Sequence, residues 1–131
     1  MTNSGWEKER YDHSVQPENA PRLSDDRLYR ALASRRRRRL LYLLIEEGKC
    51  EIEEAATVLT GWDATESSAM KTADDRERIA ITLKHVHLPL LADVGLIAYS
   101  SESDTIEIES LDSVVEDLIW RSVESEPNAT L

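Results

Sequence analysis

The stretch from Asp74 to Gly95 constrains the fold most, because it has the pattern of an amphipathic helix that stops at a glycine. Asp74 can cap the start of this helix, and Glu77 can complete a capping box with it. Pro89 lacks a backbone N–H and predicts a kink or a local break near Leu88. Gly95 can adopt the left-handed conformation that ends many helices. The apolar residues recur every three or four positions and predict one buried face: Ile79, Leu83, Val86 and Leu90.

Two strand patterns follow this helix at once. Leu96–Tyr99 and Thr105–Glu109 are predicted as strands, and in the second of them Ile106 and Ile108 alternate with acidic residues. The polar segment Ser100–Asp104 between the strands has the length of a hairpin turn. The chain is therefore predicted to place a β-hairpin directly after a long helix.

Three shorter helices are predicted upstream. Ser24 can cap the first, and the second occupies Arg35–Glu47 and ends at Gly48. A very short strand at Cys50–Ile52 leads into the third helix, which is expected to end at Gly61. Helical spacing predicts the buried residues of these helices: Leu28, Leu32, Leu40, Leu41, Leu44, Ile45, Ile52, Ala55, Ala56 and Leu59.

The remaining segments complete a mainly α fold with a small β-hairpin, of class α+β. Residues 62–73 are predicted as a loop, and a last amphipathic helix begins near Leu111 and ends before Pro127. The predicted domain organisation is a disordered N-terminal arm, one folded domain and a flexible tail: residues 1–21, 22–125 and 126–131.

The chain carries a formal net charge of −10, and the charge is unevenly spread. Residues 22–49 are basic, whereas the rest of the chain is acidic. An acidic total argues against ordinary nucleic-acid binding. Arginine greatly outnumbers lysine, phenylalanine is absent and the acids are scattered, a composition that resembles proteins working in molar salt. There the Debye length is roughly 3 Å, so we interpret the acidity first as solubility in brine.

No motif for catalysis, cofactor binding or metal binding is found, so we expect a protein that is not an enzyme. Cys50 is the only cysteine and is predicted to be a small buried residue. His85 and His87 are two apart and face different directions on a helix, which disfavours a shared metal ion. The N-terminal residues lack a secretory pattern and no segment is apolar enough to cross a bilayer, so a cytoplasmic protein is expected.

The segment around Gly95 resembles a signature of ArsR-type winged-helix repressors. It runs His87-Leu88-Pro89-Leu90-Leu91-Ala92-Asp93-Val94-Gly95-Leu96-Ile97. Upstream, the chain is similar to the opening of the same family, in Ala31-Leu32-Ala33-Ser34 and, after the arginines, Leu40-Leu41-Tyr42-Leu43-Leu44. The likeness covers about residues 28–109, and it is closer still to an uncharacterised winged-helix domain common in halophilic archaea. It implies a winged helix-turn-helix fold that binds double-stranded DNA and regulates transcription.

The helix that ends at Gly95 would then be the recognition helix. With its apolar face inward at 100° per residue, Arg78, Ile81, Lys84 and His85 face outward, Thr82 flanks them and Arg76 lies near the helix start. The predicted DNA-binding residues are therefore Arg76, Arg78, Thr82, Lys84 and His85. An ordinary solvated helix face would carry similar residues.

The five consecutive arginines Arg35–Arg39 point all around a helix and cannot form one basic stripe. One or two of them could reach phosphates or acidic partners. The rest are predicted to pair with local carboxylates or to cover apolar surface with their stems.

Two further expectations concern partners. The C-terminal helix holds more apolar surface than one small core needs, at Val115, Leu118, Ile119 and Trp120, which predicts a homodimer through it and the N-terminal helix. The hairpin is acidic, at Glu102, Asp104, Glu107 and Glu109, and would repel phosphate. The alternative is therefore a winged-helix module that binds protein without contacting DNA.

Overall fold

The computed structural model describes residues 20–67 and 70–127. Residues 1–19 of the predicted arm and residues 128–131 of the predicted tail lie outside the described residues, whereas Ala20 and Pro21 are described and buried. Helices dominate, and the three strands are short. In chain order the elements are α2 (Asp26–Leu32), α3 (Arg35–Glu47), β1 (Lys49–Glu51), α4 (Ile52–Ser67), α5 (Ala73–Thr82), η1 (Leu83–His87), α6 (Leu88–Val94), β2 (Ile97–Ser100), β3 (Thr105–Ile108) and α7 (Ser113–Glu124).

The sheet is antiparallel, with strand order β1-β3-β2. β2 and β3 form the predicted hairpin, in which Tyr99 lies opposite Ile106. β1 adds the third strand and places Cys50 opposite the same Ile106. This strand lies one residue earlier in the chain than predicted. It ends at Glu51 because Ile52 is already the first residue of α4, and the Ile52 N–H donates to the carbonyl of Asp104. The α+β class is confirmed, and the arrangement is winged-helix-like.

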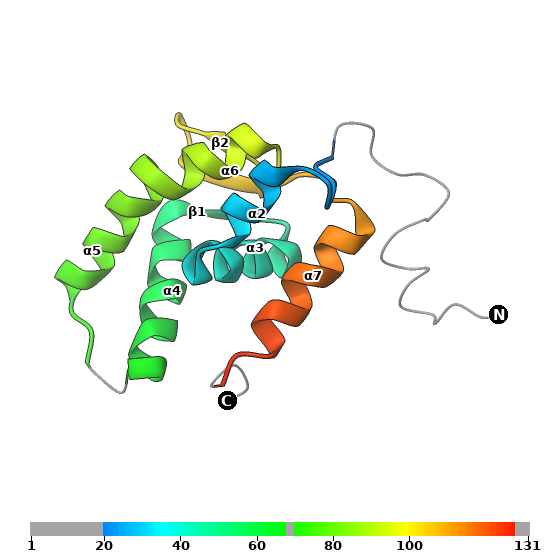
Figure 1. The fold of residues 1–131 in the computed structure, drawn as a ribbon. Coiled ribbons are helices and arrows are strands. Elements are labelled where there is room, and N and C mark those ends of the chain that lie inside the picture. The colour runs from blue at the N-terminus through cyan, green and yellow to red at the C-terminus, as the bar shows by residue number, and fades with distance from the viewer. Residues whose placement is uncertain (1–19, 68–69, 128–131) are drawn as a thin grey trace.

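Figure 1 shows how the helices enclose the core. α5, η1 and α6 follow one another as a single rod along one side, and α7 lies on the other side against α3. The predicted core positions on α2, α3 and α4 are buried except Ile45, which is half-buried, and the Cys50 side chain is buried as predicted. Each fully buried leucine contributes roughly 2 kcal/mol. The largest fully buried side chains are Leu28, Leu40, Leu41, Leu44, Ile52, Leu59, Leu83, Leu88, Leu91, Leu96, Ile106 and Ile119.

Two predicted helix caps are wrong by one or two residues. Asp25, not Ser24, caps α2, because a turn closed by Asp25 N–H and the Arg22 carbonyl delays the helix start. Thr72, not Asp74, caps α5, in a reciprocal box with Asp75. The Thr72 backbone N–H donates to Asp75 Oδ2 at 2.8 Å and is the main cause that lowers the pKa of this carboxyl.

The predicted helix end at Gly61 is also wrong, because α4 continues to Ser67. Gly61 costs a helix about 1 kcal/mol relative to alanine. Contacts of the next two residues with α3 offset this cost. Trp62 packs edge-on against Tyr42 at a ring-centroid distance of 6.2 Å, and Asp63 forms ion pairs with arginines of α3. Tertiary contacts therefore extend the helix through a residue that would otherwise end it.

The rod changes its buried face at η1, a single π-helical turn. The backbone N–H of Leu88 donates to the carbonyl of Leu83, five residues back, directly before Pro89. The extra residue in this turn moves the inward face on by one position. Val86, predicted to be buried, is 51% exposed, while His87 is only 8% exposed. The local break predicted near Leu88 is present, and its consequence is a change of face.

Candidate nucleic-acid interface

The outward face of α5 and η1 carries both basic and apolar side chains. Arg78, Lys84 and His85 are exposed, as predicted. Two apolar side chains share this stretch of the rod, Ile81 at 54% and Val86 at 51% exposure. Thr82 is half-buried and donates its hydroxyl to the carbonyl of Arg78 at 2.9 Å. The face therefore offers charge, hydrogen bonding and methyl groups together.

Each cation of this face has a carboxylate within reach. Arg78 Nη1 lies 3.1 Å from Asp75 Oδ1, and Lys84 Nζ lies 3.8 Å from Asp104 Oδ1. Arg76 pairs with Glu53 of α4, so its guanidinium is turned toward the neighbouring helix. Exposed pairs of this kind contribute about 0–1 kcal/mol, so a phosphate can replace the carboxylate.

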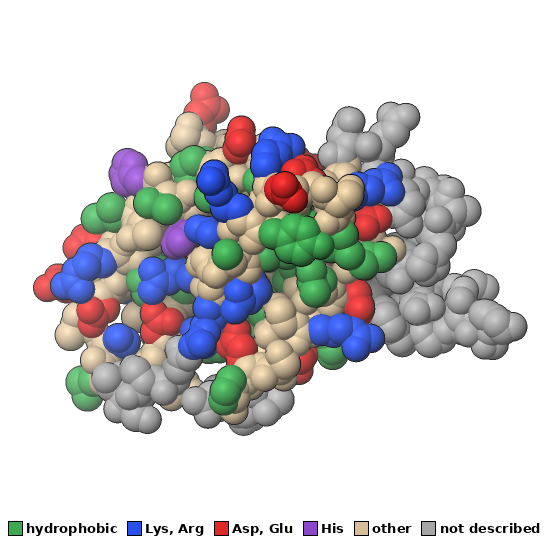
Figure 2. Space-filling model, in the orientation of Figure 1, with side chains coloured by type: hydrophobic (Ala, Val, Ile, Leu, Met, Phe, Trp, Pro, Cys, Tyr) green, Lys and Arg blue, Asp and Glu red, His purple; other side chains and the backbone are tan. Residues whose placement is uncertain are grey.

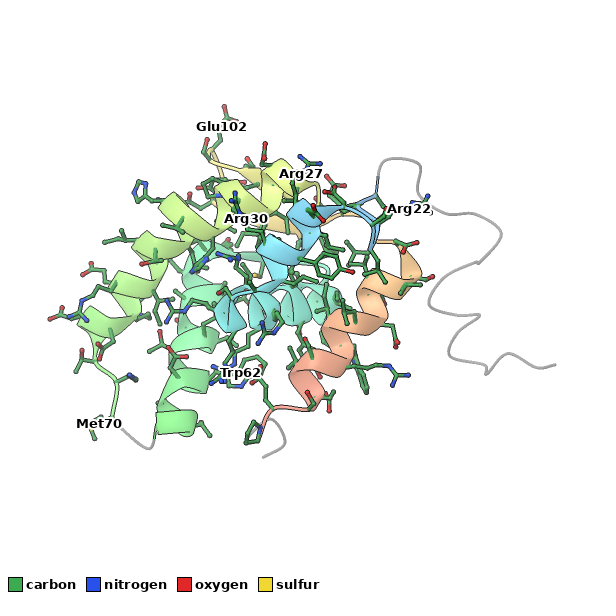
Figure 3. All side chains as sticks on the ribbon, viewed as in Figure 1. Arg22, Arg27, Arg30, Trp62, Met70 and Glu102 are labelled. Atoms are coloured by element: carbon green, nitrogen blue, oxygen red, sulfur yellow. The ribbon has the colours of Figure 1, made fainter. Side chains whose placement is uncertain are left out.

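The hairpin contacts the outward face of α5 and η1 through one acid, Asp104. Asp104 has a φ of 53°, in the left-handed region, and closes the turn between β2 and β3. Its carboxylate accepts a hydrogen bond from Tyr99 Oη at 3.1 Å and also faces Lys84. Burial, followed by this hydrogen bond, raises the pKa of the Tyr99 phenol. Glu102 lies at the outer end of the hairpin (Figure 3), so the tip is acidic.

The arginine run is largely structural, as predicted for most of its members. Arg37 Nε donates to the carbonyl of Ala31 at 2.7 Å, and Arg38 Nη1 donates to the carbonyl of Leu32 at the same distance. These bonds satisfy carbonyls that the last turn of α2 leaves without helical partners. Arg36 Nη2 lies 3.1 Å from Asp63 Oδ2.

Arg39 is the most buried cation among the described residues, at 3% exposure. Its guanidinium contacts Asp63 Oδ1 at 3.1 Å and Glu126 Oε1 at 3.0 Å, and it lies 4.8 Å from the ring centroid of Trp62. Glu126 belongs to the predicted tail, yet its carboxylate is only 8% exposed. The arginine therefore ties the C-terminal segment to α3 and α4.

His87 is a buried polar residue, although the apolar spacing of this helix predicts a buried position at Val86 instead. Its Nδ1 lies 3.1 Å from Arg37 Nη1. Burial, helped by the positive charge of Arg37, lowers the pKa of His87 to about 4. The imidazole is therefore neutral at pH 7. Because a guanidinium only donates, Nδ1 accepts and the ring proton resides on Nε2.

Two features are absent from the described residues. No group of three or more His, Cys, Asp or Glu side chains could hold a metal ion. None of the helices in residues 20–67 and 70–127 is long and apolar enough to cross a membrane.

The chain matches a protein-family model. The family described as "Domain of unknown function (DUF7344)" matches residues 29–107, which span α3 to β3 and therefore include the rod and most of the hairpin. No curated protein and no solved structure matches the chain significantly.

Proposed function

The chain belongs to the DUF7344 family, and we propose that it binds double-stranded DNA through the outward face of α5 and η1 and acts as a transcriptional regulator. One observation carries this proposal. A rod that is exposed along Arg78, Ile81, Lys84 and His85 precedes a hairpin in a small winged-helix-like fold. The ArsR-type resemblance of the helix ending supports the same function.

The face has the donors that duplex recognition uses. Arg78 can bind phosphate or guanine, Lys84 phosphate, and His85 a base edge. Ile81 supplies an apolar contact of the kind that thymine methyl groups receive. Arg76 and Thr82 complete the proposed interface, Arg76 after release from Glu53.

We propose further that the protein is a homodimer through α2 and α7. Val115 and Ile119, two of the residues from which a dimer was predicted, are fully buried in the core of one chain. Apolar side chains nevertheless remain exposed on α2 and α7, and Figure 2 shows hydrophobic surface in the region of these two helices. These side chains are Tyr29, Val114, Leu118 and Trp120, at 52%, 52%, 37% and 36% exposure. Two-fold pairing there would present two recognition rods.

The DNA proposal is tested by selecting bound fragments from genomic DNA at molar potassium chloride. Affinity for a selected fragment is then measured for Arg78→Ala and Lys84→Ala. Each change should weaken binding about tenfold, the value of one lost contact of 1–3 kcal/mol. Lys49→Ala, which removes an exposed lysine of β1, is the charge-matched control and should bind as the wild type does. Equal losses in all three variants would contradict base reading by this face.

The dimer is tested separately by sedimentation. Leu118→Glu should give a monomer, whereas Met70→Glu, at a side chain that is 92% exposed outside both terminal helices, should leave the mass unchanged. A wild-type monomer at all concentrations would refute the dimer.

The acidic hairpin favours one alternative, a module that binds a protein. Glu102, Asp104 and Glu107 place carboxylates on the hairpin, which carries no lysine or arginine between residues 97 and 108. Failure of the selection at every salt concentration would favour this alternative over DNA binding.

A further inference from the structure

The structure contains a basic hollow that the DNA-reading face does not use. It has a volume of about 660 Å³ and is bordered by the first turns of α3, the later part of α4 and the segment before α5. Its lining residues are Ser34, Arg35, Arg36, Arg39, Asp63, Lys71 and His87. Figure 2 shows Lys and Arg side chains gathered over the face between α3 and α5, with a histidine among them. We call this feature the arginine hollow.

The charge of the arginine hollow is opposite to that of the whole chain. Four cations line it against the single carboxylate of Asp63, whereas the chain as a whole carries −10. Glu126 approaches Arg39 from the C-terminal segment and adds one more acid. Among the lining residues cations outnumber carboxylates. A concave basic surface with low-dielectric walls concentrates anions.

The cations are held in place before any ligand arrives. Asp63 fixes two of them, with Oδ2 at 3.1 Å from Arg36 and Oδ1 at 3.1 Å from Arg39. Arg39 is further fixed by Trp62 and by burial of its side chain to 4% exposure. Guanidiniums that are already oriented lose little side-chain entropy when they bind an anion.

A histidine donor also lines the arginine hollow. His87 is 8% exposed, and its Nδ1 is occupied by Arg37, which leaves the proton on Nε2. Nε2–H is therefore the donor that this ring can offer to a ligand in the arginine hollow.

The ligand that fits these groups is a compact oxyanion of high charge. Guanidiniums bind phosphate oxygens in pairs, a lysine adds a point charge, and Ser34 and His87 add neutral hydrogen bonds. We propose that the arginine hollow binds a phosphate group, either of a phosphorylated small molecule or of a nucleic-acid backbone. A second, smaller hollow of about 230 Å³ shares Arg36, Asp63 and Lys71 and extends to Arg78. The site therefore lies directly beside the proposed DNA face, although it does not depend on DNA binding.

Trp62 provides the readout, because the guanidinium of Arg39 stacks on its ring. In a Trp6→Phe, Trp120→Phe background, Trp62 is the only tryptophan. Inorganic phosphate is titrated at constant ionic strength while chloride is withdrawn. We expect a saturating change in Trp62 fluorescence with a dissociation constant of about 1 mM, the affinity of a few charge-assisted hydrogen bonds.

The variants decide whether the arginine hollow is the site. Lys71→Gln should weaken phosphate binding about tenfold, and Arg35→Gln with Lys71→Gln should abolish it, while Lys49→Gln should have no effect. Circular dichroism and the urea midpoint establish that each variant is folded. A linear response without saturation, or equal affinities in Lys71→Gln and Lys49→Gln, would overturn the proposal.

A second arm identifies the source of the phosphate. If inorganic phosphate displaces a selected duplex from the wild type and not from Lys71→Gln, the arginine hollow holds a backbone phosphate. If the duplex binds equally well to the phosphate-loaded protein, the ligand is a separate phosphorylated molecule. The phosphate titration itself contains no DNA, so it can succeed when the proposed function fails.

Discussion

The buried imidazole of His87 predicts a loss of stability in mild acid. Its pKa is about 4 in the folded protein, against an ordinary value of 6.5 that the unfolded chain should have. As the pH falls below 6.5 the unfolded chain takes up a proton that the folded chain does not, so the free energy of unfolding decreases. This decrease amounts to about 2 kcal/mol between pH 7 and pH 5 and about 3 kcal/mol by pH 4. The contribution of His87 is therefore complete above pH 6.5 and is lost as the pH falls toward 4.

Urea unfolding at pH 7, 6 and 5 measures this effect while most carboxylates stay ionised. His87→Gln keeps an acceptor for Arg37 but cannot titrate, so its stability should depend much less on pH over this range. His85→Gln removes an exposed histidine of the same π-helical turn and should keep the wild-type slope. The reasoning is refuted if the free energy of unfolding of the wild type stays constant from pH 7 to pH 5. Parallel curves for the wild type and His87→Gln would refute it equally.

Three further predictions address stability and DNA affinity. Arg39→Ala leaves the buried carboxylate of Glu126 without its cation. The free energy of unfolding, measured in urea, should therefore fall by about 3–5 kcal/mol. A loss below about 1 kcal/mol would show that the Arg39–Glu126 ion pair is unimportant for stability. Gly95→Ala should lower the free energy of unfolding by about 1–2 kcal/mol, because the backbone φ of +97° is strained for alanine. The added Cβ would meet Pro21 at 3.8 Å, an ordinary contact distance, so an unchanged thermal midpoint would contradict backbone strain. Asp104→Asn keeps a residue type that tolerates the left-handed turn and removes the carboxylate that pairs with Lys84. DNA binding should become a few-fold tighter, and the gain should be larger at lower salt. Unchanged or weaker binding would contradict repulsion by the hairpin.

The sequence predicted those parts of the fold that depend on local signals. The end of the rod at Gly95, the following hairpin and the span of α3 are local patterns of glycine and apolar spacing, and all are present. The exposure of Arg78, Lys84 and His85 was predictable for the same reason, although the function of this face is still a proposal.

The missed features depend on contacts between residues far apart in the chain. α4 passes through Gly61 because Trp62 and Asp63 contact α3, and spacing within α4 contains no sign of those partners. Pro89 was the only sequence sign that the helix is interrupted near η1. A proline does not specify which residue is the extra residue of the π-helical turn, so the change of buried face could not be predicted. The sequence therefore does not predict that His87 is buried. In the folded chain its imidazole contacts Arg37, which lies fifty positions away.

Arg37 joins the two parts of the molecule to which the proposals assign different tasks. The Arg37 guanidinium donates hydrogen bonds to the carbonyls of Arg30 and Ala31 in the last turn of α2. It also contacts Nδ1 of His87 in η1. It therefore links α2, where we propose that two subunits pair, to the rod that we propose enters the DNA groove. In a dimer built through α2, two such links would set the separation of the paired rods. The protein would then tolerate little variation in the spacing between the half-sites of its operator.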